Sequence, residues 1–211
     1  MSEHKGIFIS FEGIDGCGKS TQVRLLAAAL EERGHECLFL REPGGTELGE
    51  GIRDLLLREF SSQTDPRSEL LLFLAARSQI VSECILPALA RGEIVICDRF
   101  YDSTMAYQGY GRGLPLDYLR DLNSFACRGL KPDMTILLEA SEELCAERLA
   151  GRKEEQNRFD LEAQKFRERV RQGFQSLAEA EPARFSIFST AGKRELTAQT
   201  VLQAVLDKFD L

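Results

Sequence analysis

The sequence lacks any excess of positive charge. Its 211 residues include 27 Lys and Arg against 34 Asp and Glu, which gives a formal net charge of -7. Proteins that grip a nucleic-acid backbone neutralise its phosphates with dense basic side chains. The charge balance therefore excludes that class. We expect any phosphorylated partners to be small molecules held locally, and no nucleic-acid partner.

Paired cysteines and targeting segments are also lacking. The six cysteines include no C-x-x-C pair, so neither a zinc site nor a disulfide framework is indicated, and a reduced compartment fits best. The N-terminal segment MSEHKGIFISFE lacks the charged-then-apolar run of a signal peptide. We also expect no apolar stretch long enough to span a bilayer. These absences predict a cytoplasmic protein with no membrane partner.

What the sequence does contain is an alternation of short apolar runs with longer helical patterns. The runs lie at residues 6–12, 37–41, 94–97, 134–139 and 185–189. Continuous apolarity is typical of strands covered on both faces, as in a parallel sheet. Strands that alternate with helices predict an α/β fold with right-handed crossovers. The length and the lack of a linker predict a single domain over residues 1–211.

Two segments depart from this simple alternation. Residues 151–160 (GRKEEQNRFD) form a polar, highly charged interruption between two helical patterns, and we predict that they form a mobile lid. Residues 69–89 are apolar over more than one helix face. A helix that packs against the core through one face needs only one apolar face, so the second requires another explanation. The second apolar face predicts either a ligand pocket or a subunit interface.

The segment after the first apolar run fits the phosphate-binding pattern G-x-x-x-x-G-K-[ST]. It follows a predicted strand and precedes a predicted helix, as the motif requires. In such a loop the backbone N–H groups surround the phosphates, the lysine reaches the β- and γ-phosphates, and the hydroxyl reaches Mg²⁺. A glycine-rich turn that only joins strand to helix is the alternative. We predict an NTP site at Gly13, Ile14, Asp15, Gly16, Cys17, Gly18, Lys19, Ser20 and Thr21.

The motif alone does not choose among kinases, GTPases and ATPase switches. The guanine-specific pattern N-K-x-D is absent, which favours ATP over GTP. Cys17 lies among the amide groups of the loop at a helix N-terminus, an environment that raises thiol reactivity. We therefore expect a reactive Cys17 that ATP protects, with a buried, inert thiol as the alternative.

A candidate partner for the metal ion lies at the end of another apolar run. Asp98 follows the run at 94–97, and Arg99 comes directly after it. A carboxylate at a strand end is the layout of the acid that helps to hold Mg²⁺ beside a phosphate-binding loop. We predict a metal site at Ser20 and Asp98. The alternative for Asp98 is an ordinary turn or helix-cap residue.

At this point the sequence resembles the thymidylate kinase family over nearly its whole length. The matching blocks are FEGIDGCGKS (11–20), REPGG (41–45), FLAARSQ (73–79), DRFYDSTMAYQGYGRG (98–113) and PDMTILLEAS (132–141). The resemblance implies a P-loop kinase fold, with a five-stranded parallel sheet flanked by helices, usually in a homodimer. It also implies transfer of the γ-phosphoryl group of ATP to dTMP, with Mg²⁺ as cofactor and dTDP and ADP as products.

The resemblance also implies a binding site for dTMP. Arg99 would hold its phosphate with Arg53 as companion, because a guanidinium suits phosphate oxygens. Asp15 would receive the sugar 3′-hydroxyl, with Glu42 in the same region. Phe73 would stack on thymine, with Arg77 reaching a base carbonyl, and Ser103 and Gln108 would close the base edge. Without the resemblance, Arg53 reads equally well as a solvated charge and Phe73 as a core residue.

The remaining catalytic arginines are expected in the lid. The variable positions of the phosphate loop contain no arginine, whereas the lid carries Arg152, Lys153 and Arg158. This resembles the bacterial arrangement, in which a lid arginine closes over ATP. Arg152 or Arg158 would join Lys19, Asp98 and Arg99 in catalysis, and Arg148 would pack on adenine beside the loop at 189–193. A salt-bridged solvated loop is the alternative.

Three other functions compete with this interpretation. A kinase for another nucleoside monophosphate would share the phosphate loop, and a deoxynucleoside kinase would in addition need a base to activate a hydroxyl. A nucleotide-dependent switch or interaction protein would hydrolyse ATP slowly and need no acceptor. The two histidines, His4 and His35, lie outside every motif, which agrees with a phosphate acceptor that needs no general base.

Overall fold

The protein is built on a parallel sheet of five strands. A computed structural model describes residues 5–151 and 164–211, and its strands lie in the order β2-β3-β1-β4-β5. Every pair of neighbouring strands is parallel. The strand bounds are β1 Ile7–Glu12, β2 Cys37–Arg41, β3 Ile94–Asp98, β4 Met134–Glu139 and β5 Phe185–Ser189. All five predicted apolar runs are therefore strands, with ends that differ by at most one residue.

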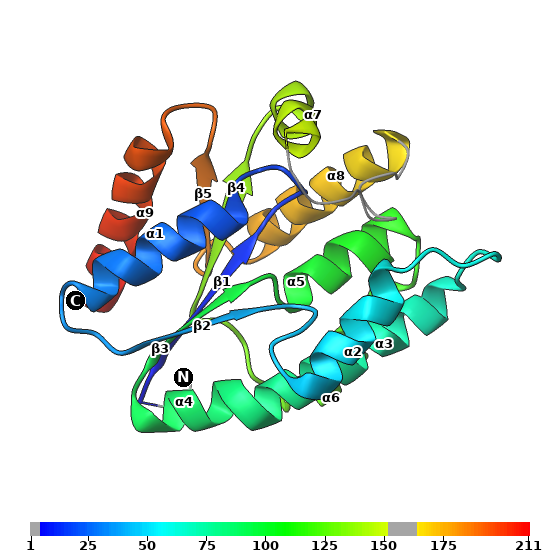
Figure 1. Ribbon diagram of the computed structural model, residues 1–211, viewed down its shortest axis with the longest axis horizontal. Coiled ribbons are helices and arrows are strands. Elements are labelled where there is room, and N and C mark those ends of the chain that lie inside the picture. Colours follow the sequence, from blue (N-terminus) through cyan, green and yellow to red (C-terminus); the bar gives the residue numbers. More distant parts are fainter. Residues whose placement is uncertain (1–4, 152–163) are drawn as a thin grey trace.

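Helices cover both faces of this sheet (Figure 1). Helices α1 and α9 lie side by side on one face. On the other face lie the long helical segment that ends in α4, together with α5, α6 and α8. The bounds are α1 Lys19–Glu31, α2 Glu47–Leu57, α3 Pro66–Ile80, α4 Leu86–Arg91, α5 Tyr101–Thr104, α6 Leu116–Ala126, α7 Glu142–Ala150, α8 Gln164–Ala180 and α9 Arg194–Phe209.

Two segments have π-helical hydrogen bonding: η1 (Val81–Ile85) joins α3 to α4, and η2 (Met105–Gly111) continues α5. Helix α3 starts where the sequence indicates, because the Asp65 side chain accepts a hydrogen bond from the Arg67 N–H and Pro66 occupies the first turn. Pro87 lacks an N–H group and would clash with the carbonyl four residues before it in a regular helix. The wider π-helical turn immediately before Pro87 lets the segment continue to Arg91.

The segment Pro66–Arg91 also corrects an expectation from the sequence. Its 26 residues have a window of mean hydropathy 1.5, which is long and apolar enough by length and composition to cross a membrane. The prediction that no such stretch exists is therefore wrong. Core helices of soluble proteins pass the same test. Here Ile80, Val81 and Ile85 are fully buried against the sheet, in one cluster with Val95 of β3.

The two faces of β1 bury different parts of the core. Ile9 and Phe11 pack in the cluster that includes residues of α1 and α9, whereas Phe8 packs with α4 and β3. Ser10, between them, donates to or accepts from the Thr135 hydroxyl of β4 at 2.9 Å. This central strand is therefore held on both sides, and it ends in a rigid edge from which the phosphate loop begins.

Candidate active site

The predicted functional segments meet at one edge of the sheet. The register pairs both Phe11 of β1 and Arg41 of β2 with Asp98 of β3. The loop after β1, the REPGG segment after β2 and the Asp98–Arg99 pair therefore lie side by side. The carboxyl ends of parallel strands are the usual position of ligand sites in open α/β sheets.

The phosphate loop depends on glycine for its shape. Gly13 and Gly16 have φ of 136° and 82°, in the left-handed region that other residues rarely adopt. A Cβ atom on Gly13 would lie 2.5 Å from the Leu138 carbonyl oxygen, and one on Gly16 would lie 2.5 Å from the Cys145 carbonyl oxygen. The loop can therefore sit against β4 and α7 only because both positions lack a side chain.

The loop leads into α1, and its basic and hydroxyl side chains lie where the motif predicts. The Lys19 ammonium donates to the carbonyl oxygens of Gly13 and Ile14 at 3.0 and 2.9 Å. The Ser20 hydroxyl donates to Asp98 Oδ2 at 2.7 Å, across 78 residues of sequence. The structure thus brings together the two residues predicted to hold a metal ion.

The chemistry of this pair suits Mg²⁺. A hydroxyl and a carboxylate are hard oxygen ligands, and Mg²⁺ is usually bound by one or two carboxylates together with substrate phosphates and water. Within the described residues no group of three or more His, Cys, Asp or Glu side chains could form a protein-only metal cage. The Ser20 hydroxyl and the Asp98 carboxylate fit Mg²⁺ by the type of ligand atom they offer.

Arg148 joins the phosphate loop to the loop after β5. Its guanidinium donates to the Thr190 carbonyl oxygen at 2.7 Å and to the Thr190 hydroxyl oxygen at 3.1 Å. The Thr190 hydroxyl in turn donates to the Cys17 carbonyl oxygen at 2.8 Å. The Arg148 side chain and the 189–193 loop therefore border the nucleotide loop, the region where adenine contacts were predicted.

The Cys17 side chain does not face this region. It is fully buried in the core cluster beneath the loop, and a Cβ atom on Gly13 would meet its sulfur at 2.8 Å. The expectation of an accessible reactive thiol is therefore wrong. The backbone N–H of Cys17 donates to the Ile14 carbonyl oxygen at 3.3 Å.

A pocket opens beside the phosphate loop. Its wall includes every residue that was predicted to bind dTMP, contributed by four separate stretches of the chain. These are Asp15, Glu42, Arg53, Phe73, Arg77, Arg99, Ser103 and Gln108. Asp15 belongs to the phosphate loop as well, so the pocket and the nucleotide loop share a wall.

Arg99 lies at the centre of the pocket's charged end. Its guanidinium donates to Asp15 Oδ1 at 2.7 Å, to the Ser103 hydroxyl oxygen at 2.9 Å and to the Tyr107 hydroxyl oxygen at 3.2 Å. Burial acts to raise the pKa of Asp15, but Arg99 and Lys19 outweigh it and hold that pKa well below its usual range. Asp15 therefore stays ionised, and the cluster holds Arg99 in one orientation.

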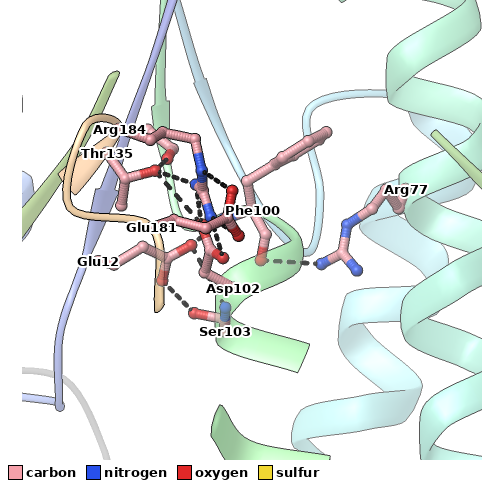
Figure 2. Close-up of polar contacts among 9 residues, drawn as sticks. Glu12, Arg77, Phe100, Asp102, Ser103, Thr135, Glu181 and Arg184 are labelled. Carbon is pink, nitrogen blue, oxygen red and sulfur yellow. Dashed lines mark hydrogen bonds and ion pairs between the residues drawn. The ribbon is translucent and has the colours of Figure 1, made fainter. Parts of the chain in front are cut away.

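Arg77 and Glu42 form a buried ion pair in the same wall. Arg77 Nη2 lies 2.6 Å from Glu42 Oε2, and the side chains are 1% and 3% exposed. Other Arg77 N–H groups donate to the Thr104 hydroxyl, the Asn123 amide oxygen and the Phe100 carbonyl oxygen, the last shown in Figure 2. With Nε also bonded to Glu42, all five donors of the guanidinium face protein acceptors.

This arrangement bears on the predicted contact between Arg77 and a base carbonyl. Such a contact would have to share an N–H group that is already bonded within the protein. Burial raises the pKa of Glu42, and Arg77 lowers it by less, so the net direction is upward. In the described part of the chain, the second carboxylate oxygen of Glu42 is buried without a hydrogen-bond partner.

The far end of the pocket is more apolar. Phe73 packs beside the cluster of Ile52 and Leu56 from α2, and its ring is only partly buried. The Gln108 side-chain amide donates to Glu69 Oε1 at 2.8 Å, which fixes its orientation at the pocket wall. Arg53 donates to the Pro43 carbonyl oxygen at 3.1 Å. Phe73 therefore serves as wall and core contact at once.

The sequence interpretation missed four residues of this wall: Pro43, Leu57, Thr104 and Tyr107. Of these, Tyr107 joins the charged cluster directly: its hydroxyl donates to Asp15 Oδ2 at 3.1 Å and accepts from Arg99. Burial raises the pKa of Tyr107, so the phenol keeps its proton. The only signal was its place in the block DRFYDSTMAYQGYGRG, four residues after Ser103 on the same helical segment.

The predicted lid arginines, Arg152 and Arg158, lie outside the described residues. The lid prediction therefore stays a prediction. What the structure describes is the base from which this segment departs, because α7 ends at Ala150 and α8 resumes at Gln164. Arg148, in the last turn of α7, donates to the Gly16 carbonyl oxygen of the phosphate loop at 3.4 Å.

Comparison with known proteins gives a consistent result. The family model for thymidylate kinase matches residues 11–201. The thymidylate kinase of Desulfovibrio desulfuricans is 46% identical over 209 residues, covering 95% of this chain and 96% of the relative. That of Geotalea daltonii is 47% identical over 213 residues, covering 97% and 99%.

A solved structure agrees with the sequence comparison. The crystal structure of thymidylate kinase from Ehrlichia chaffeensis superimposes with a TM-score of 0.79 at 34% identity, and the match covers 95% of this chain and 98% of that one. The fold and the arrangement of the phosphate loop, the Asp98–Arg99 pair and the adjoining pocket are thus accompanied by full-length similarity. The chain belongs to the thymidylate kinase family.

Proposed function

We propose that this chain transfers the γ-phosphoryl group of ATP to dTMP, giving ADP and dTDP, with dTMP bound in the pocket beside the phosphate loop. One observation carries the proposal. The predicted acceptor residues converge on a single pocket, and Asp15 belongs both to this pocket and to the nucleotide loop. The acceptor pocket therefore adjoins the nucleotide loop.

Arg99 binds the acceptor phosphate together with Arg53, which lines the same pocket. A bidentate guanidinium matches phosphate oxygens in charge and geometry. Asp15 and Tyr107 hold Arg99 from the side of the sugar, where Asp15 also receives the 3′-hydroxyl. Phe73 stacks on thymine, and Ser103 and Gln108 contact the base edge. The Glu42 oxygen that lacks a hydrogen-bond partner among residues 5–151 and 164–211 suits a donor group of the substrate, because buried acceptors normally have partners.

The proposed reaction needs no general base. The acceptor is a phosphate monoester whose second pKa is about 6, so it is ionised near neutral pH. The obstacle is repulsion between two polyanions. Lys19 at the donor phosphates and Arg99 at the acceptor phosphate lower that repulsion, and both act electrostatically on Asp15 between the two sites. We also assign a lid arginine, Arg152 or Arg158, to the charge that develops on the transferred group.

Ser20 and Asp98 would hold Mg²⁺ together with the donor phosphates. When bound, Mg²⁺ neutralises charge on the β- and γ-phosphates. The 2.7 Å hydrogen bond between Ser20 and Asp98 supports this assignment, since the two oxygen ligands are already adjacent.

We further propose that the chain is a single-domain cytoplasmic enzyme that forms a homodimer. Helix α6 carries an exposed apolar row at Tyr118, Leu122 and Phe125, and Phe125 is 85% exposed. Leu71 on the neighbouring helix α3 is also exposed. Such a patch on packed helices suits an isologous contact with a second copy. Leu71 belongs to residues 69–89, the segment for which the sequence predicted a pocket or an interface, whereas the row on α6 lies outside that segment.

A substrate panel tests the proposed function. ADP release from ATP with Mg²⁺ is followed with dTMP, dUMP, CMP, AMP, GMP and thymidine as acceptors in turn. We expect dTMP to be used best. dUMP lacks the methyl group of thymine, and its kcat/KM should be about 10-fold to 200-fold lower. That is the discrimination that one methyl group gives in a hydrophobic pocket. Equal turnover of another acceptor, or ADP release without one, would refute the assignment.

A further inference from the structure

Glu12, the last residue of β1, lies behind the acceptor pocket and is fully buried. Its carboxylate accepts three hydrogen bonds from the start of the α5 segment (Figure 2). Oε1 accepts from the Phe100 N–H at 2.7 Å and from the Ser103 N–H at 3.3 Å, and Oε2 accepts from the Ser103 hydroxyl at 2.6 Å. Glu12 does not line the pocket, so it acts on the pocket only through other residues.

The Ser103 hydroxyl connects Glu12 to Arg99. A hydroxyl has one proton to donate and two lone pairs that accept. Because Ser103 donates its proton to Glu12, its lone pairs are left for the Arg99 guanidinium, which donates to it at 2.9 Å. An ionised Glu12 therefore sets the direction of the hydroxyl that holds one arm of the Arg99 side chain.

The backbone at Arg99 needs the same support. Arg99 has φ of 73°, in the left-handed region that costs a non-glycine residue on the order of 1 kcal/mol or more. Its own N–H donates to the Phe11 carbonyl oxygen at 2.9 Å. The next N–H, of Phe100, donates to Glu12. The strained turn is therefore held at both ends by consecutive residues of β1, Phe11 and Glu12.

We propose that Glu12 is a positioning residue for phosphoryl transfer: through Ser103 and the backbone of Phe100 it orients Arg99 toward the acceptor phosphate. The inference rests on the phosphate-binding role of Arg99 in the proposed function. It adds a residue that touches neither substrate. It also explains why an acid is buried at the end of a central strand, where an apolar residue would be less costly.

The charge of Glu12 has few direct partners. In the part of the chain that the structure describes, no basic group lies within ion-pair distance of it, whereas the nearby Asp102 has its own partner in Arg184 at 2.6 Å (Figure 2). Burial, followed by repulsion from Asp102, raises the pKa of Glu12 to about 7, and Arg99 opposes this. The titratable and charged groups that face Glu12 are Arg77, Cys97, Arg99 and Asp102.

Three variants test the inference. Glu12→Gln keeps the shape but places an amide donor against Ser103. Ser103→Ala removes the connection and leaves the Glu12 contact with Phe100. Asp133→Asn is the matched control, because the Asp133 carboxylate accepts the Phe8 N–H at 2.8 Å at the opposite end of β1. Each variant is purified as the full chain, and its thermal unfolding is compared with that of the wild type before kinetics.

We expect Glu12→Gln and Ser103→Ala each to lower kcat/KM for dTMP about 10-fold to 100-fold, the range of a hydrogen bond to a charged group. The KM for ATP should stay within about twofold of the wild type, because the phosphate loop is unchanged. The double variant should be little worse than Ser103→Ala alone, because that variant already lacks the hydroxyl that connects Glu12 to Arg99. Asp133→Asn should leave both KM values unchanged.

The pH profile separates a positioning role from a merely structural one. The ratio of wild-type to Glu12→Gln kcat/KM for dTMP is measured from pH 5.5 to 8.5, in which the titration of the substrate phosphate cancels. We expect a large ratio at pH 8.5 that falls toward one below about pH 6.5, because protonated Glu12 can no longer accept from Ser103 as an anion. A ratio that stays constant with pH would overturn the inference, as would additive effects in the double variant.

Arg99→Ala distinguishes failure of the inference from failure of the proposed function. dTMP affinity is measured by calorimetry for Arg99→Ala, Glu12→Gln and the wild type. If Arg99→Ala binds dTMP as the wild type does, the role of Arg99 falls and the inference falls with it. If Arg99→Ala weakens binding and Glu12→Gln leaves both binding and turnover unchanged, the inference alone is wrong.

Discussion

The Glu42–Arg77 pair allows a sharp test of how burial changes the worth of an ion pair. Arg77 Nη2 and Glu42 Oε2 are 2.6 Å apart with side chains 1% and 3% exposed, whereas Arg120 Nη1 and Asp117 Oδ1 are also 2.6 Å apart but 60% and 95% exposed. The two distances are equal, and the pairs differ most in their exposure to solvent. Replacing Glu42 or Asp117 by Ala therefore compares a buried ion pair, held in a wider hydrogen-bond network, with a solvated one.

The expected magnitudes differ severalfold. Glu42→Ala leaves the Arg77 guanidinium buried without its anionic partner, which costs about 3–5 kcal/mol. Asp117→Ala removes a solvated pair worth about 0.2–1 kcal/mol. At about 2–4 °C per kcal/mol for a chain of this size, the melting temperature should fall by about 6–20 °C in the first variant and by at most about 4 °C in the second.

The assay is thermal and urea unfolding at pH 7.5, with and without saturating dTMP. The double variant Glu42→Ala with Arg77→Met should lose less stability than the sum of the two single variants, because neither charge is then left alone. Glu42→Ala should also weaken dTMP binding, since both residues line the pocket. If Glu42→Ala shifts the melting temperature no more than Asp117→Ala does, the reasoning from burial is refuted.

Three further predictions concern catalysis, assembly and pH. Arg152→Ala should lower kcat by on the order of 10³-fold with little change in the KM for dTMP, whereas Arg99→Ala should lower kcat and also raise the KM for dTMP. If steady-state kinetics show that Arg152→Ala and Arg158→Ala both keep the wild-type kcat, the lid assignment is contradicted. Phe125→Asp should convert a dimer into a monomer of about 23.7 kDa by sedimentation, and a wild type that is already monomeric at micromolar concentration would refute it. Burial raises the pKa of Glu12 from 4.5 to about 7, so the native state holds this proton more tightly than the unfolded chain does, and this group lowers stability as pH rises from about 4.5 to 7. Relative to the wild type, Glu12→Gln should therefore be more stable at pH 8 than at pH 5 in thermal unfolding, and the opposite trend would contradict the sign.

Much of the fold was readable from local patterns. The runs at 37–41, 134–139 and 185–189 coincide with β2, β4 and β5. The inner strand β4 is buried from Met134 to Leu138 and is therefore nearly continuously apolar, whereas the edge strands β2 and β5 each keep an exposed apolar residue, Phe39 and Ile187. The Asp65–Pro66 signal marks the start of α3 for an equally local reason, a side-chain cap followed by a residue without an N–H group. The apolar row on α6 was missed, because a pattern of apolar positions does not say which of them the rest of the chain will cover.

The candidate site divides in the same way. The sequence alone determined the phosphate loop, because its chemistry is carried by backbone N–H groups and neighbouring residues within one short segment. With the family resemblance, it also indicated which side chains would meet at the acceptor pocket. What it did not indicate was their partners: the ion pair of Arg77 with Glu42 spans 35 residues, and the Ser103 contact with Glu12 spans 91.

Such partnerships were decided by the tertiary structure alone. A buried carboxylate has its function set by the donors around it and by how far water is excluded, and neither is visible in the identity of its neighbours along the chain. Glu12 is the clearest case. In the sequence it is the last residue of an apolar run, and only the parallel register of β1 with β3 places its carboxylate against the turn that carries Arg99.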